Sequence, residues 1–73
     1  MIKKDILEAA RAKFNADYLE AKTQIKIYTE SPSGIGEHPQ IVEEVVKLVK
    51  QMQEAKDCMS AIDGLITLQL EID

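Results

Sequence analysis

The clearest pattern in the chain is a run of apolar residues in its second half, spaced alternately four and three residues apart. The series is Ile41, Val45, Leu48, Met52, Ala55, Met59, Ile62 and Ile66. Because an α-helix has 3.6 residues per turn, this spacing places all of these side chains on one face. The pattern predicts a helix over about residues 39–63, with Pro39 suited to the first helical position.

A second helical pattern occupies the first half of the chain. Its apolar face consists of Leu7, Phe14, Tyr18, Ala21, Ile25 and Tyr28, and Arg11 interrupts this series. The aliphatic stem of an arginine covers such a face while its charge reaches water. Asp5 and Glu8 have the spacing of a capping box, so the helix is expected over about residues 5–29.

The residues that disrupt helices are concentrated between these two patterns. Segment 31–39 contains both prolines and two of the three glycines of the chain. Pro32 disfavours a helical conformation at the residue before it, so a loop is expected over about 30–38. The sequence therefore predicts one all-α domain over 1–73, an antiparallel helical hairpin.

The tail over residues 64–73 has two interpretations. Gly64 is suited to ending a helix, and Ile66, Leu68, Leu70 and Ile72 then alternate with polar residues as in a strand. Segment 23–28 would pair with that strand, which gives a small α+β fold as the alternative. Ile62, Leu65 and Ile66 also fit a helix that continues through Gly64, so the sequence leaves helix and strand open.

The two helices have more apolar surface than a hairpin can cover. Val42, Val46 and Val49 form a second apolar line beside the main face, and Ile6 and Ile27 lie outside the face of the first helix. A chain of 73 residues is also short for a self-sufficient domain. We therefore expect these five residues to form an interface, either in a homo-oligomeric helix bundle or with a different protein.

Composition excludes several classes of function. The net charge of −4 argues against a nucleic-acid partner, and one cysteine with one histidine is too few for a zinc cage. No apolar run approaches the roughly 20 residues that span a bilayer, and the start lacks a secretory signal. A cytoplasmic, non-enzymatic protein with no metal or cofactor is expected, because no nucleophile–base pair can be assembled.

The loop offers a different kind of site. Gly34 and Gly36 permit close backbone approach, and the amides before a helix N-terminus favour an anion. With His38, Lys22 and Lys26 they form a candidate site for a nucleotide or another anion. The segment lacks the third glycine of a dinucleotide fold and the lysine of a P-loop, so a tight interhelical turn is the competing interpretation.

This loop also carries a family resemblance. Ile27-Tyr28, Ser31-Pro32 and Gly34-Ile35-Gly36-Glu37-His38-Pro39 followed by Ile41-Val42-Glu43 resemble a family of short uncharacterised proteins from tailed phages. The resemblance covers about residues 25–60 and is specific only in the loop. It implies a non-structural accessory protein that is made in an infected bacterium, and it assigns no activity or catalytic residue.

Overall fold

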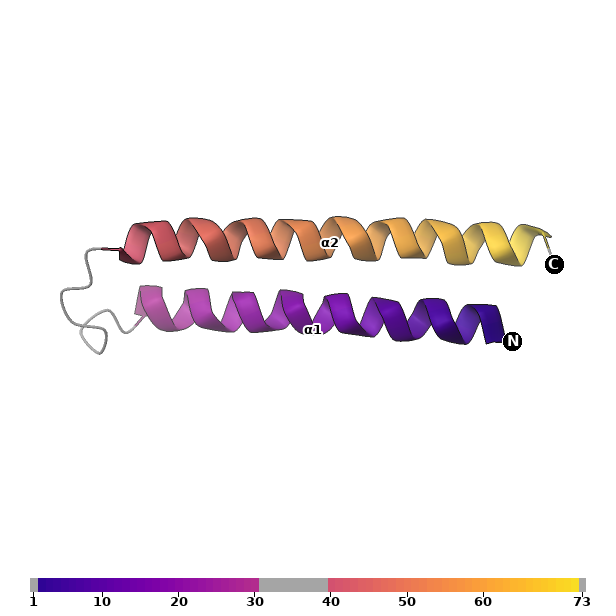
Figure 1. Ribbon diagram of the computed structural model, residues 1–73, viewed down its shortest axis with the longest axis horizontal. Helices are drawn as coiled ribbons and strands as arrows, with labels where there is room; N and C mark the ends of the chain where they lie inside the picture. Colours follow the sequence, from indigo (N-terminus) through magenta and orange to yellow (C-terminus); the bar gives the residue numbers. More distant parts are fainter. Residues whose placement is uncertain (1, 31–39, 73) are drawn as a thin grey trace.

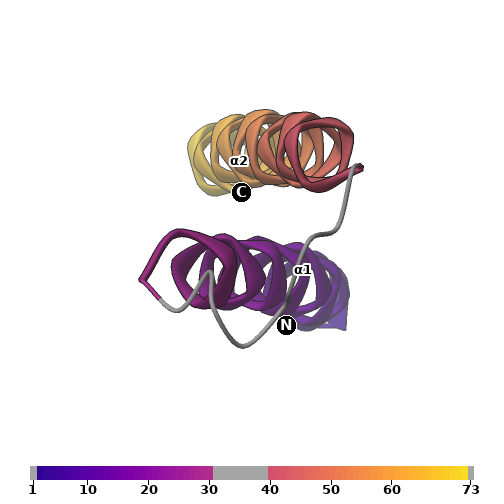
Figure 2. The same cartoon turned by 90° about the vertical axis from the view of Figure 1, so that its left-hand side faces the viewer.

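The computed structural model describes residues 2–30 and 40–72, which form two long helices. Helix α1 spans Ile2–Glu30 and helix α2 spans Ile41–Ile72. They lie side by side and antiparallel, so the start of α1 and the end of α2 are at the same end of the molecule (Figure 1). The described residues contain no strand, and the predicted all-α antiparallel hairpin is confirmed. Figure 2 shows the two helices end-on, as a single pair.

The apolar series predicted for the second half forms the contact line of α2. Leu48, Ala55, Met59 and Ile62 are buried, and the remaining members of the series are half-buried. Gln69, which continues the same spacing, is half-buried as well. We call these residues, from Ile41 to Gln69 at four- and three-residue steps, the seam of α2.

The seam of α1 consists of Leu7, Arg11, Phe14, Tyr18, Ala21, Ile25 and Tyr28. Ala21 is completely buried and all of the others are half-buried. Arg11 therefore occupies a contact position, as expected from its place in the series, and its charge is met by α2. Small residues at the buried positions, such as Ala21 and Ala55, allow the two helices to approach closely.

Helix α2 is longer than expected, and the strand alternative for the tail is wrong. The helix passes through Gly64 and continues to Ile72. Gly64 is exposed, and a Cβ built on it would contact nothing within 4 Å. The glycine therefore neither ends the helix nor provides space for a neighbouring residue. A glycine inside a helix costs only about 1 kcal/mol, which the packing of Ile62 and Ile66 on either side offsets.

The alternation that suggested a strand has a helical explanation. Leu68 and Leu70 lie on either side of the seam residue Gln69, and both leucines are about half exposed. Segment 23–28, the strand partner in the α+β alternative, lies within α1 and is helical. An apolar residue on each flank of a seam thus reproduces the two-residue period of a strand.

Helix α1 begins before the expected capping box. It starts at Ile2, so Asp5 lies in its first turn, where a negative charge suits the positive end of the helix dipole. The Glu8 carboxylate pairs with Lys4 Nζ at 3.8 Å. At the start of α2, the Glu44 amide donates to the Gln40 carbonyl at 2.9 Å, so the first helical hydrogen bond closes on Gln40. The predicted role of Pro39 falls outside the described residues.

Candidate interaction surfaces

Each helix has two flanks, one on either side of its seam. A residue that follows a seam residue is rotated by roughly 100° to one side, and a residue that precedes it is rotated by the same amount to the other. Because the helices are antiparallel, the following residues of both helices share one face of the hairpin. The preceding residues share the opposite face.

The first of these, the valine face, carries Leu19, Val42, Val46, Val49 and Leu70, each of which directly follows a seam residue. All five are 47% or more exposed. A groove of about 310 Å³ opens between the helices beside them. Its lining consists of Tyr18, Ile25, Val49, Met52, Gln53 and Lys56.

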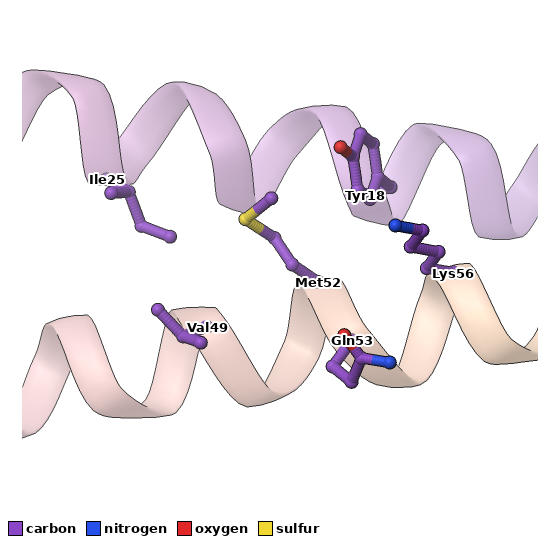
Figure 3. Close-up of a pocket in the computed structure, with 6 residues that line it drawn as sticks. All are labelled: Tyr18, Ile25, Val49, Met52, Gln53 and Lys56. Atoms are coloured by element: carbon purple, nitrogen blue, oxygen red, sulfur yellow. The ribbon is translucent and has the colours of Figure 1, made fainter.

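Figure 3 shows how this groove is built. Met52 extends from α2 toward α1, into the space between Ile25 and Tyr18, and Val49 lies on the opposite wall from Ile25. The Lys56 side chain is directed toward Tyr18 of α1. The groove is therefore mainly apolar, with Lys56 at one end.

The opposite, leucine face carries Ile6, Ile27, Leu65 and Leu68, each of which directly precedes a seam residue. These four side chains are half or more exposed. A hydrogen bond joins the helices on this face, from Gln51 Nε2 of α2 to the Asp17 carbonyl oxygen of α1 at 3.3 Å. Its apolar residues gather near the chain termini, apart from Ile27, which lies near the end of α1.

All five residues predicted for an interface are exposed. The exposed fractions are 63% for Ile6, 55% for Ile27, 70% for Val42, 47% for Val46 and 51% for Val49. They do not form one surface, because the valines lie on the valine face and the two isoleucines on the leucine face. The hairpin therefore presents two separate apolar surfaces on opposite sides.

Four exposed leucines were missed by the sequence reasoning: Leu19, Leu65, Leu68 and Leu70. Each is adjacent to a seam residue, which is the same signal that singled out Val42 and Val49. Leu65, Leu68 and Leu70 were missed because the tail was assigned to two alternative structures. Leu19 stands alone on its flank of α1 and forms no line with a neighbour.

The valine face is polarised along its length. Lys22 and Lys26 follow seam residues near the end of α1 and are exposed. Near its start, Glu8 follows the seam residue Leu7, Asp5 lies one turn earlier on the same side, and both are exposed. The basic end of this row lies beside the three valines, and the acidic end lies beside Asp63 and Leu70. Opposite charges thus occupy opposite ends of one face.

The candidate anion site stays a prediction. Lys22 and Lys26 lie on the valine face near the end of α1 and are exposed. Gly34, Gly36 and His38 lie outside the described residues. Among residues 2–30 and 40–72, no group of three or more His, Cys, Asp or Glu side chains is placed to hold a metal ion. The part of the chain that the structure describes also has no helix apolar enough to cross a membrane.

Arg11 and Asp63 form an ion pair across the two helices. Arg11 Nε donates to Asp63 Oδ1 at 2.7 Å, and Nη2 donates to Oδ2 at 3.1 Å. The hydrogen bonds from Arg11 lower the pKa of the Asp63 carboxyl below its ordinary value of 3.8, and the pair raises the pKa of Arg11. Both side chains are partly exposed, so the pair serves mainly to fix the relative position of the helices.

Comparison of the chain with protein-family models, with curated proteins and with solved structures finds no match.

Proposed function

We propose that this chain is a non-enzymatic interaction module, an oligomeric helical hairpin that binds a host or phage protein. The observation that carries the proposal is the exposure of nine large apolar side chains on two opposite faces of a pair of helices. Monomeric soluble proteins rarely expose large contiguous apolar areas. These exposed side chains therefore support an interaction surface on each face.

The energetics favour covered faces. Burial of a half-exposed valine, isoleucine or leucine contributes roughly 1 kcal/mol, from the value of about 25 cal/mol per Å² of apolar surface. The apolar residues of one face together therefore contribute several kcal/mol. The net free energy of unfolding of a small domain is of the same order. An isolated hairpin is therefore only marginally stable, and burial of a face in a complex stabilises it.

Binding to a foreign protein is tested most directly on the leucine face. A tagged chain is used to capture proteins from bacteria infected with a tailed phage, and the captured protein is purified and titrated by calorimetry. We expect saturable binding to the unaltered chain and a loss of at least tenfold in affinity when Leu65 and Leu68 are both changed to Ser. Unchanged affinity in that variant would contradict the assignment of this face.

Sequestration of a nucleotide or another anion is the alternative function. Its support is the exposed pair Lys22 and Lys26 and the glycine-containing loop sequence. A ligand at 100 times its dissociation constant stabilises the folded state by about 2.7 kcal/mol, so a thermal-shift screen with nucleotides separates the two functions. We expect no shift; a shift that Lys22→Ala and Lys26→Ala abolish would favour the alternative.

A further inference from the structure

We infer that the valine face docks a second copy of this chain, antiparallel to the first and related to it by a twofold axis that passes beside Asn15 and Lys56. The inference rests on the proposed function and deepens it, since it names the partner of one of the two apolar faces. It leaves the leucine face, on the outside of the resulting four-helix bundle, for a different protein.

The charge pattern of α1 carries the orientation. The residues of α1 on the valine face are Asp5, Glu8, Ala12, Asn15, Leu19, Lys22, Lys26 and Thr29, and all are exposed. If a second copy of α1 runs in the opposite direction along this row, its charges are complementary to those of the first copy. Asp5 lies opposite Lys26 of a second copy, Glu8 opposite Lys22 and Ala12 opposite Leu19. The midpoints of these three pairs all fall at or next to Asn15.

The valine-face row of α2 has its midpoint at the same level of the hairpin as that of α1. Its row on the valine face begins with Val42 and ends with Leu70, two apolar residues whose midpoint is Lys56. Phe14 and Ala55 line the same small pocket on the hairpin, so the residues that follow them, Asn15 and Lys56, lie at one level. A single twofold axis perpendicular to the helices therefore satisfies both rows.

Lys56 does not oppose this arrangement. Two lysines face each other across the axis, but the Lys56 side chain is directed toward Tyr18 in the groove (Figure 3). Its charge is therefore directed toward α1 and not toward its symmetry mate on the second α2. In this register Val42 lies opposite Leu70 of the other copy, Val46 lies next to its Thr67, and Val49 lies opposite its Asp63. The carboxylate of that Asp63 is bound by Arg11 of its own chain.

Parallel docking of the same two faces lacks this complementarity. If both copies pointed the same way, all four copies of Lys22 and Lys26 would gather at one end and all four acidic residues at the other. Opposite charges at matched positions fix register and orientation, and like charges oppose the alternative. The available area is also comparable with a standard interface, because the 32 residues of α2 span about 48 Å. With a hairpin width of 15 Å, such a face approaches the roughly 800 Å² that each partner buries.

The test uses two charge-reversed variants of the full chain. In the first, Lys22→Glu is combined with Lys26→Glu; in the second, Asp5→Lys is combined with Glu8→Lys. Each variant alone places like charges against each other at both ends of the dimer, and an equimolar mixture restores opposite charges at both ends. We expect each variant to be at least tenfold weaker in self-association than the unaltered chain by sedimentation equilibrium, and the mixture to recover a dimer of both variants.

A cysteine reporter tests the position of the axis. In a Cys58→Ser background, Asn15→Cys is expected to form an intermolecular disulfide readily in air, because the two copies of this position meet at the axis. Lys13→Cys, two residues away on the leucine face, is the matched control and should form at least tenfold less.

The outcomes separate the two proposals. Variants that stay dimeric alone, a mixture that does not recover, or equal crosslinking at positions 13 and 15 would overturn the antiparallel docking and leave the proposed function standing. An unaltered chain that is monomeric throughout the micromolar range would overturn the dimer itself, and the oligomeric part of the proposed function with it.

Discussion

The guanidinium of Arg11 and the carboxylate of Asp63 join the two helices at a sequence separation of 52 residues, with Nε donating to Oδ1 at 2.7 Å. The arginine occupies a seam position of α1 that would otherwise be apolar, and the aspartate follows the seam residue Ile62 of α2. The pair therefore fixes which turn of one helix faces which turn of the other. A shift by one heptad would leave both charges without this partner.

This pair makes the stability of the hairpin depend on pH in the acidic range. The pKa of Asp63 is lowered in the folded state, so its contribution is complete above the ordinary value of 3.8 and is lost as the pH falls through the lowered value. We expect the difference in free energy of unfolding between the unaltered chain and Asp63→Asn to be constant near neutral pH and to shrink below pH 3.8. Urea titrations followed by circular dichroism measure it.

Arg11→Gln provides the control for that measurement. It removes the donor and leaves the carboxylate, so its pH dependence should resemble that of Asp63→Asn and differ from that of the unaltered chain. If Arg11→Gln retained the acidic decline of the unaltered chain, the ion pair would not be its source.

Replacement of Gly64 should stabilise the protein. The glycine lies inside α2 with nothing within 4 Å of the position that a Cβ would take, and it belongs to neither of the two faces. Gly64→Ala should therefore raise the stability by about 0.5–1 kcal/mol, the difference in helix propensity. Thermal unfolding should move upward by a few degrees, and a decrease would mean that α2 ends at this residue.

The buried end of the seam should be sensitive to truncation, in contrast to the adjacent leucine. Ile62 is 7% exposed and Leu65 is 50% exposed. Ile62→Ala should cost about 2–4 kcal/mol because it leaves a cavity in the core. Leu65→Ala, on the leucine face of the free protein, should cost less than about 1 kcal/mol. Equal losses in chemical denaturation would contradict the assigned seam.

The seam of α2 was predictable because every member of an uninterrupted four-and-three series lies on one side of a helix. Each predicted position from Ile41 to Ile66 is buried or half-buried. The end of the helix was not predictable, since Gly64 is a common helix terminator whose cost is small enough for packing to outweigh. Likewise, the alternation around Leu68 and Leu70 is consistent with a strand until the seam is known to continue at Gln69.

The interface residues were predicted as a set and not as an arrangement. Val42 and Ile6 were singled out because each lies outside a seam, but the flanks of the two helices were not paired. Only the antiparallel contact places the valines with Lys22 and Lys26 on one face and the isoleucines on the other. The Arg11–Asp63 pair escaped prediction for the same reason, since its partners meet only once the register is fixed.

A single substitution on the valine face should separate folding from assembly. Val46→Glu places a charge on a side chain that is 47% exposed in the hairpin and covered in the antiparallel dimer. We expect its helical circular dichroism at high concentration to remain, with self-association weakened at least tenfold. Leu68→Glu, on the leucine face, is the matched control and should leave self-association unchanged.

The solution mass at micromolar concentration tests the central claim most directly, because the claim is that this hairpin exposes more apolar surface than it can leave in water. Sedimentation equilibrium of the unaltered chain should give twice the 8.2 kDa of one copy, with a melting temperature that rises with concentration. A mass of one copy, with a sharp transition that is independent of concentration, would contradict the account.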